Sequence, residues 1–188
     1  EMSSRGLGDV YKRQDIASVY SVLTQLNENG FKGVAMEVSS HELDQRRLGL
    51  LEFDVCVFTN LTRDHLDYHG SMEAYGKAKQ RLFSSNPGAC AVVNADDAYG
   101  KFLLQWLSDN SVRDVISYGI DAPSAALRAV DLQYSARGVS GHLAYKGQLV
   151  PFQADLIGAF NVQNLLAAVG VCLSLGENIA DIASHIYK

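Results

Sequence analysis

Short apolar runs alternate with longer amphipathic segments over residues 15–118, and this alternation constrains the fold of the 188-residue chain more than any other feature. Short apolar runs of this kind are typical of strands that are buried on both faces. Strands that alternate with helices favour a parallel sheet with right-handed crossovers. The predicted fold class is therefore α/β, with a mostly parallel sheet flanked by helices. The predicted strands are Gly33–Val38, Phe53–Phe58, Ala89–Val93 and Val112–Tyr118.

Segments with a helical period separate and follow these runs. In the first segment, apolar side chains recur every three or four residues from Ile16 to Leu26, and Gly30 follows as a stop signal. Ser71 has the chemistry of an N-cap residue for the helix that follows it. The predicted helices are Asp15–Asn29, Ser71–Phe83, a segment from Asn94 to about Leu107, Asn161–Leu175 and Asn178–Tyr187.

The pattern changes between Ala126 and Phe152. Short segments alternate apolar and polar residues there, and Lys146-Gly147 stands between two of them with the composition of a hairpin turn. We therefore predict a small antiparallel β patch that is attached to the parallel sheet.

Charge and composition argue against several classes of function. The net charge of −5 offers no general attraction to nucleic acid or to an anionic membrane, so neither is an expected partner. No apolar run approaches the ~18 residues that span a bilayer, and the first residues carry no apolar signal-peptide core. The three cysteines stand in apolar contexts and are expected to be reduced thiols. We expect a cytoplasmic protein.

Polar side chains follow two of the predicted strands. The segment EVSSHELDQRR, Glu37–Arg47, follows the first strand, and TNLTRDHLDYHG, Thr59–Gly70, follows the second. In an open parallel sheet, ligands bind at the carboxyl ends of the strands. These two segments are therefore expected to line a site, and Asn60 stands where the second one begins.

Glu37 has two interpretations that the sequence leaves open. Its carboxylate could bind a hard cation such as Mg²⁺, which prefers a few carboxylates together with water and phosphate oxygens. It could equally cap the next element through the amides of Ser39 or Ser40. Ser39, Gln45 and Arg47 supply a hydroxyl, an amide and a guanidinium group that suit a polar, anionic ligand, although ordinary loop polarity would explain them as well.

Titratable residues crowd the second segment at Asp64, His65, Asp67 and His69. His65 could coordinate a metal or orient a phosphate, with Asp64 fixing the orientation of its ring. A zinc site is conceivable, but no cysteine or third histidine has convincing spacing nearby. A loop of this composition can also be simply solvated.

Two groups on the predicted helices complete the set of candidates. Lys77, Lys79 and Arg81 alternate, so they do not share one helix face, and a solvated surface explains each of them alone. Asn161 suits the N-cap position of its helix. Asn164 lies one turn later, where asparagine is a poorer helix former, so its amide is a candidate for hydrogen bonding to a nucleobase.

Several stretches resemble the central, ATP-binding domain of the Mur ligase family. They are MEVSSHELDQRR, FDVCVFTNLTRDHLDYHGSMEAYGKAKQRLF, AVVNADDAYG and LIGAFNVQNLLAA, which together cover most of residues 31–175. The resemblance is strongest to the branch that adds a diamino acid, meso-diaminopimelate or L-lysine, to UDP-MurNAc-L-Ala-D-Glu in peptidoglycan biosynthesis. It implies that ATP converts the substrate carboxylate to an acyl phosphate, which the amine then attacks.

The resemblance also implies roles for individual residues, with ATP and Mg²⁺ as cofactors. His65 and Lys79 would be catalytic, and Lys79 would be carbamylated, so that a cation becomes a carboxylate-like ligand. The implied metal ligands are Glu37, His65 and Lys79. The implied contacts to the UDP-muramoyl dipeptide are Ser39, Gln45 and Arg47. The implied nucleotide contacts are Asn60, Asn161 and Asn164.

Departures from the family pattern set limits on this interpretation. The phosphate loop G-x-x-G-K-[ST] is missing before Asp15, and residues 1–14 are expected to be non-native. Residues 15–188 are then expected to be the central domain without its N-terminal part, and the UDP-binding and amino-acid-binding domains are expected to be absent. Such a fragment is expected to be inactive alone. The alternatives are a metal-dependent hydrolase using Glu37, Asp64, His65 and His69, and a non-catalytic binding domain.

Overall fold

The computed structural model describes residues 16–49, 51–62, 66–112 and 114–186. It divides the chain into two compact units, Glu1–Leu51 and Glu52–Lys188, which we describe separately. His65 and Asp64 lie outside the described residues, and so do Asp15 and residues 1–14.

The described residues of the first unit form two helices, α1 (Ile16–Glu28) and α2 (Ser40–Asp44). Helix α1 confirms the predicted helical period, but none of its residues is buried. The predicted strand Gly33–Val38 is wrong, because residues 31–39 form neither helix nor strand. A strand needs a neighbour for its backbone hydrogen bonds, and no pairing is recorded for this segment among the described residues. Val34, in the middle of the segment, is 51% exposed.

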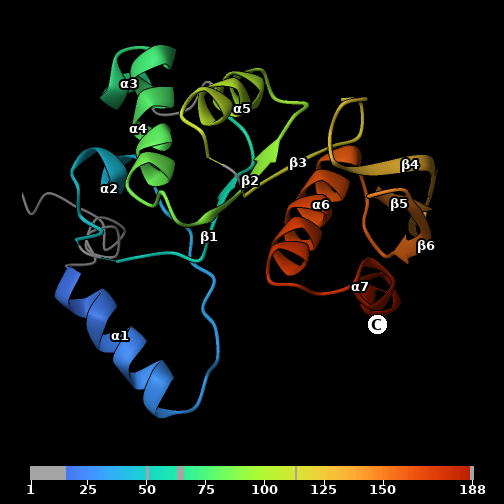
Figure 1. Cartoon of the computed structure of the whole chain (residues 1–188), viewed down its shortest axis with the longest axis horizontal. Helices are drawn as coiled ribbons and strands as arrows, with labels where there is room; N and C mark the ends of the chain where they lie inside the picture. Colours follow the sequence, from blue (N-terminus) through green and yellow to red (C-terminus); the bar gives the residue numbers. More distant parts are fainter. Residues whose placement is uncertain (1–15, 50, 63–65, 113, 187–188) are drawn as a thin grey trace, which may run out of the picture. The chain divides into compact units, whose positions relative to one another are not determined.

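The second unit is built on one six-stranded sheet with the strands in sequence order (Figure 1). The strands are β1 (Val55–Phe58), β2 (Cys90–Asn94), β3 (Val115–Gly119), β4 (Leu127–Ser135), β5 (Gly138–Tyr145) and β6 (Gln148–Ala154). Strands β1 to β4 pair in parallel and β4 to β6 pair antiparallel. The predicted α/β class and the antiparallel patch are both confirmed. The patch continues the parallel sheet through a short β3–β4 pairing, Tyr118↔Leu127 and Gly119↔Arg128.

Among the described residues, the helices of the second unit are the four predicted ones, with shifted ends, and a short helix before them that was not predicted. They are α3 (Leu66–His69), α4 (Met72–Ser84), α5 (Ala98–Asp109), α6 (Ala159–Ser174) and α7 (Ile179–Ile186). Ser71 is the N-cap of α4, as predicted, and its hydroxyl accepts a hydrogen bond from the Ala74 amide at 3.1 Å. Helix α5 begins later than predicted because Asp97 caps it and accepts from the amides of Tyr99 and Gly100.

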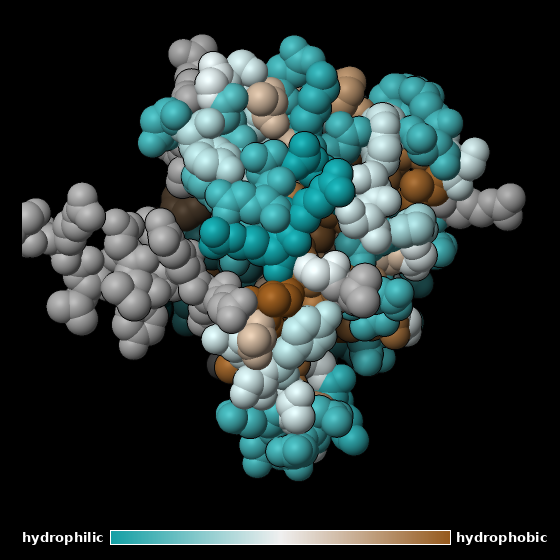
Figure 2. Space-filling model, turned by 90° about the vertical axis from the view of Figure 1, so that its left-hand side faces the viewer, coloured by the Kyte–Doolittle hydropathy of each residue, from teal (hydrophilic) through white to brown (hydrophobic). Residues whose placement is uncertain are grey.

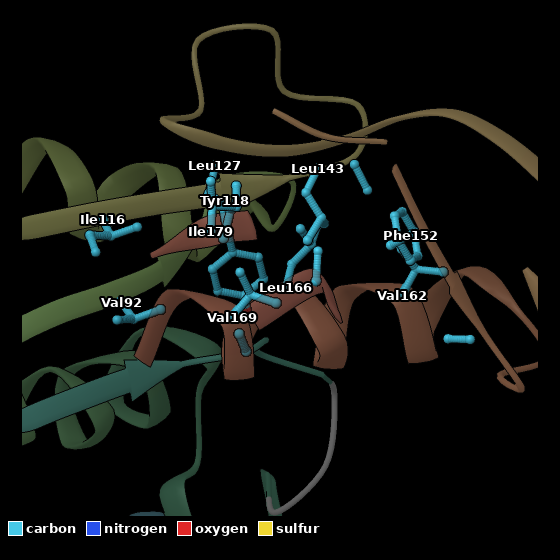
Figure 3. Packing of buried hydrophobic residues seen from close by; sticks show 14 of the residues in the cluster. Val92, Ile116, Tyr118, Leu127, Leu143, Phe152, Val162, Leu166, Val169 and Ile179 are labelled. Carbon is cyan, nitrogen blue, oxygen red and sulfur yellow. The ribbon is translucent and has the colours of Figure 1, made fainter. Parts of the chain in front are cut away.

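The two faces of the sheet bury different sets of side chains, because successive residues of a strand point to opposite faces. On one face Cys56, Phe58, Ala91 and Val93 pack with Phe83 of α4 and with Leu103 and Leu107 of α5. On the other face α6 supplies Val162, Leu166 and Val169, which lie against Tyr118, Leu127 and Leu143 (Figure 3). The parallel part of the sheet is therefore covered on both faces, and α6 packs on the parallel and antiparallel parts together.

The tight turn between β5 and β6 has the predicted sequence. Lys146 and Gly147 both have positive φ, 46° and 77°, as a two-residue type I′ hairpin requires. Pro151 lies on β6, at the end of the strand order, where a missing backbone N–H is tolerated.

The face in Figure 2 is dominated by hydrophilic residues, with hydrophobic ones in small separate groups.

Cys56, Cys90 and Cys172 are free thiols, as predicted. Cys56 and Cys90 belong to opposite faces of the sheet, so they do not form a pair. Within the described chain, we find no helix with both the length and the apolar character that crossing a membrane requires.

Candidate functional site

The carboxyl end of β2 organises the edge of the sheet where a ligand site is expected. Asp96 follows this strand, and its carboxylate accepts hydrogen bonds from three successive amides beyond β3. The distances are 2.7 Å from Ile120, 3.1 Å from Asp121 and 2.7 Å from Ala122. A carboxylate that binds three backbone amides holds the loop after β3 in one conformation.

Gly119 makes room for this arrangement. A Cβ atom at Gly119 would lie 2.7 Å from Asp96 Oδ1, which is closer than real Cβ contacts. The close approach of the two chain segments therefore depends on a residue without a side chain.

Asp96 also reaches helix α6. The side-chain amide of Gln163 donates to Asp96 Oδ2 at 3.3 Å, across 67 positions of sequence. Gln163 lies in the beginning of α6, between Asn161 and Asn164. Asp96 thus connects the end of β2, the loop after β3 and the first part of α6.

Asn94 and Asp97 join the ends of β1 and β2. The Asn94 side-chain amide donates to the Thr59 carbonyl at 2.8 Å, and its oxygen accepts from the Asp96 amide at 2.9 Å. Asp97 accepts from the Leu61 amide at 3.2 Å. These bonds hold the backbone on both sides of Asn60, whose own side chain is exposed.

A hollow of about 470 Å³ opens beside Asp96. Its polar side chains include Lys101 and Gln105 from α5, and Asp121 and Ser124 from the loop after β3. Its remaining lining residues are Ala95, Leu104, Ala122 and Pro123.

The two candidate asparagines of α6 differ in their surroundings. The helix begins at Ala159 with Gly158 as its N-cap, so the prediction of Asn161 as the N-cap is wrong. Asn161 is half-buried, and its side-chain amide donates to the Ile157 carbonyl at 2.8 Å. Asn164 is exposed. Of the two, Asn164 therefore has the side chain that a ligand can reach more easily.

Lys79 occupies a more enclosed position on α4 than its basic neighbours. It is half-buried, whereas Lys77 and Arg81 are exposed, as the prediction of different helix faces implies. Its Nζ lies 5.4 Å from the centroid of the Tyr75 ring, which is buried. The His69 ring stacks on Tyr75 with 5.0 Å between the ring centroids.

Burial raises the pKa of two tyrosines near this edge. It raises the pKa of Tyr99 to about 12, with a further contribution from the charge of Glu73. Burial also raises the pKa of Tyr118, and the negative charges of Asp96 and Asp97 raise it further. Tyr118 therefore stays protonated, and its hydroxyl lies 3.4 Å from the Phe58 carbonyl as a donor.

In the first unit, Ser39 stabilises the beginning of helix α2, whereas the sequence analysis named it as a candidate ligand contact. It is the N-cap of α2, and its amide donates to Glu42 Oε2 at 2.8 Å while its hydroxyl accepts from the Glu42 amide. The capping carboxylate is therefore Glu42, and the alternative that gave this role to Glu37 is wrong. Glu37 is exposed, and so are Gln45 and Arg47 at the end of α2.

The described residues contain no group of three or more His, Cys, Asp or Glu side chains that could hold a metal ion. Within the second unit, Asn60 follows the end of β1, and Asn161 and Asn164 lie about one turn apart in α6. The proximity of these residues to Ser39, Gln45, Arg47 and Glu37, which belong to the other unit, stays a prediction. Sequence reasoning did not identify Asp96 or Gln163. The signal for Asp96 was its place in the Asn-Ala-Asp-Asp run directly after a buried strand.

Comparisons with known proteins identify the relatives of this chain. A family model described as the Mur ligase middle domain matches residues 4–172, which includes part of the segment expected to be non-native. The UDP-N-acetylmuramoyl-L-alanyl-D-glutamate–2,6-diaminopimelate ligase of Ectopseudomonas mendocina (strain ymp) is 45% identical over 168 residues. The match covers 89% of this chain and 34% of that protein, so the chain spans about a third of the length of this relative.

Solved structures give the same result at the level of the fold. A structure of a UDP-N-acetylmuramoyl-L-alanyl-D-glutamate–2,6-diaminopimelate ligase matches with a TM-score of 0.85 and 30% identity, over 94% of this chain and 36% of that one. The MurF ligase of Thermotoga maritima in complex with ADP matches with a TM-score of 0.56 and 21% identity, over 70% of this chain and 30% of that one. At this lower identity, the similarity concerns the fold alone.

Proposed function

This chain belongs to the Mur ligase family, and from this premise we propose that it is the middle, nucleotide-binding part of an ATP-dependent ligase. The reaction would join diaminopimelate to UDP-N-acetylmuramoyl-L-alanyl-D-glutamate in peptidoglycan synthesis. The observation that carries the proposal is the 45% identity, over 89% of the chain, to a ligase with this name. The same relatives favour diaminopimelate over L-lysine as the added amino acid. A cytoplasmic location, where ATP is available, belongs to the same proposal.

The proposed reaction has two steps. The γ-phosphoryl group of ATP passes to a carboxylate of the UDP-linked dipeptide, which gives an acyl phosphate and ADP. The amine of diaminopimelate then attacks the acyl carbon, and inorganic phosphate leaves as the amide bond forms. Positioning and neutralisation of charge contribute most to catalysis of phosphoryl transfer.

We assign the nucleotide contacts to the edge of the sheet in the second unit. Asn164 is exposed at the start of α6, where its side chain would hydrogen-bond the edge of adenine, while Asn161 holds the preceding loop through Ile157. Asn60 is exposed at the end of β1 and would face the same nucleotide. Ser39, Gln45 and Arg47 are proposed to contact the UDP-linked dipeptide.

The metal ligands are proposed from the family resemblance alone. They are Glu37, His65 and Lys79, the last after carbamylation. The described residues do not by themselves define a magnesium site. When bound, Mg²⁺ would neutralise charge on the transferred phosphoryl group.

The proposed carbamylation of Lys79 can be tested separately. Carbamylation would replace the cationic amine of Lys79, which is half-buried, with an anionic carbamate, whereas Lys77 is exposed and serves as the comparison. Arginine preserves the positive charge but cannot be carbamylated. Lys79→Arg should therefore be as inactive as Lys79→Ala, whereas Lys77→Arg should retain activity.

A chimeric ligase tests the proposed function. The matching segment of the Ectopseudomonas mendocina ligase would be replaced by this chain, and phosphate release would be measured with ATP, the UDP-linked dipeptide and diaminopimelate. We expect release that requires all three substrates and is lost in Lys79→Arg and Asn164→Ala. A folded chimera that hydrolyses substrate without ATP would support the hydrolase alternative. Full activity in the Glu37→Ala and Lys79→Ala variants would support a non-catalytic domain.

A further inference from the structure

The beginning of α6 has few side-chain anchors of its own. Its N-cap is Gly158, which provides no side-chain hydrogen bond to the helix amides. Ile157 and Phe160, on either side of the helix start, are 69% and 67% exposed. Val162 is fully buried and packs the first turn against the sheet from one side. The Asn161 side chain bonds only locally, to the Ile157 carbonyl, whereas the hydrogen bond from Gln163 to Asp96 connects the helix start to the edge of the sheet.

Asp96 is a rigid partner for this hydrogen bond. Its carboxylate is held by the amides of Ile120, Asp121 and Ala122, so it cannot rotate without breaking those bonds. The neighbouring main chain is fixed as well, because the Asp96 amide donates to Asn94. A side chain that bonds to Asp96 is therefore placed relative to both strand ends.

We propose that Asp96 and Gln163 are positioning residues for nucleotide recognition, which set the first turn of α6, and with it Asn164, relative to the edge of the sheet. Gln163 immediately precedes Asn164 in the helix, so a shift of the backbone at one residue moves the other. The inference rests on the proposed function, because it takes the adenine of ATP as the group that Asn164 meets. Neither residue touches the reacting atoms.

The chain offers substitutions that separate this role from general stability. Gln163→Leu keeps nearly the same volume and removes the donor, while the three backbone amides still satisfy Asp96. Gln163→Glu places a second carboxylate beside Asp96 and should displace the helix start through repulsion. Gln163→Lys restores a donor that can reach Asp96. Gln133→Leu, at an exposed position on β4, is the matched control.

The first measurement uses the 188-residue chain itself. Amide hydrogen exchange should become faster at residues 159–164 in Gln163→Leu and Gln163→Glu, and should stay unchanged in Gln163→Lys and Gln133→Leu. Amides 120–122 should keep their protection in Gln163→Leu. Unchanged exchange at the helix start in both Gln163→Leu and Gln163→Glu would overturn the proposed anchor, whatever the protein binds.

The second measurement uses the chimeric ligase. Small displacements of a binding group can cost up to about a hundredfold, so we expect Gln163→Leu to raise KM for ATP by roughly tenfold with kcat changed less than about twofold. Gln163→Lys should restore KM. A purely structural role would instead lower the melting temperature and leave KM unchanged, and that result would overturn the proposal. An inactive parent chimera would count against the proposed function, while the exchange experiment would still decide on the anchor.

Discussion

Gly100 occupies a point where the backbone leaves no room for a side chain. It lies in the first turn of α5, and a Cβ atom there would stand 1.9 Å from the Asn94 carbonyl oxygen. An alanine normally stabilises a helix by about 1 kcal/mol relative to glycine. Here the sign should reverse, because the backbone of β2 or of α5 must move.

We expect Gly100→Ala to lower the free energy of unfolding by about 1–3 kcal/mol, as overpacking does in well-packed cores. Urea unfolding at neutral pH measures the change. Gly88→Ala is the control, since no atom lies within 4 Å of a Cβ atom at that position, and its effect should stay within about 0.5 kcal/mol. A stabilised Gly100→Ala variant would show that the close approach to Asn94 is absent in solution.

The buried thiol of Cys56 should make the stability of the protein depend on pH. Burial raises the pKa of its thiol from 9.0 to about 12, and the neighbouring Cys90 adds to the shift. Between these values the unfolded chain releases the proton while the folded chain keeps it. The free energy of unfolding should therefore fall as pH rises from about 9 towards about 12.

The contribution of one such proton cannot exceed about 1.4 kcal/mol per pH unit. Urea unfolding of the parent chain and of Cys56→Ala at several pH values isolates the contribution of the Cys56 thiol. Other alkaline titrations, including that of Tyr99, remain in both proteins. The parent should lose stability with pH more steeply than the variant. Equal slopes would contradict the assignment to Cys56.

At the scale of the secondary-structure elements, α5 depends on its N-cap. Asp97 accepts hydrogen bonds from Tyr99 and Gly100, and a third from the Leu61 amide beyond β1. Asp97→Ala should lower the free energy of unfolding by about 1–2 kcal/mol, which is the upper part of the range for N-caps. Asp97→Asn keeps one acceptor for the helix amides and should cost less. Urea unfolding compares the two variants, and an equal loss would show that the cap itself contributes little.

Most elements could be predicted because their signals are local. The apolar period of α1, the hydroxyl of Ser71 before α4 and the Lys146-Gly147 turn each lie within a few residues of the structure that they determine. The strand predicted at Gly33–Val38 is wrong. The composition of this segment suits a strand, but strand formation depends on a pairing partner that the sequence does not specify.

The site could be predicted less completely than the elements. Sequence position placed polar residues at strand ends, and the structure confirms this for Asn60 at β1. The Asp96–Gln163 hydrogen bond joins residues that are 67 positions apart, so no local pattern could indicate it. The N-cap of α6 was missed because Gly158, with φ of 91°, starts the helix without a side chain.

At the scale of the whole second unit, α6 connects the two parts of the sheet. Leu166 is fully buried in a cluster that includes Val92 of the parallel part and Phe152 of the antiparallel part. Leu166→Ala should lower the free energy of unfolding by about 2–5 kcal/mol, the usual cost of a cavity at a buried leucine.

The loss should appear as one cooperative transition, because both parts of the sheet share this contact. Urea unfolding followed by circular dichroism and by Trp106 fluorescence checks both points. Leu175→Ala, at a leucine that is 63% exposed, should change stability by less than about 0.5 kcal/mol. Two separate transitions in the parent chain would contradict the shared core.

The hydrogen bond between Asp96 and Gln163 also has an evolutionary consequence. A donor and an acceptor that meet across the fold constrain each other, so a substitution at one position changes which residues are acceptable at the other. Relatives that lack a carboxylate at the position of Asp96 should also lack a donor at the position of Gln163. The two alignment columns should then covary, although they are 67 positions apart in the chain.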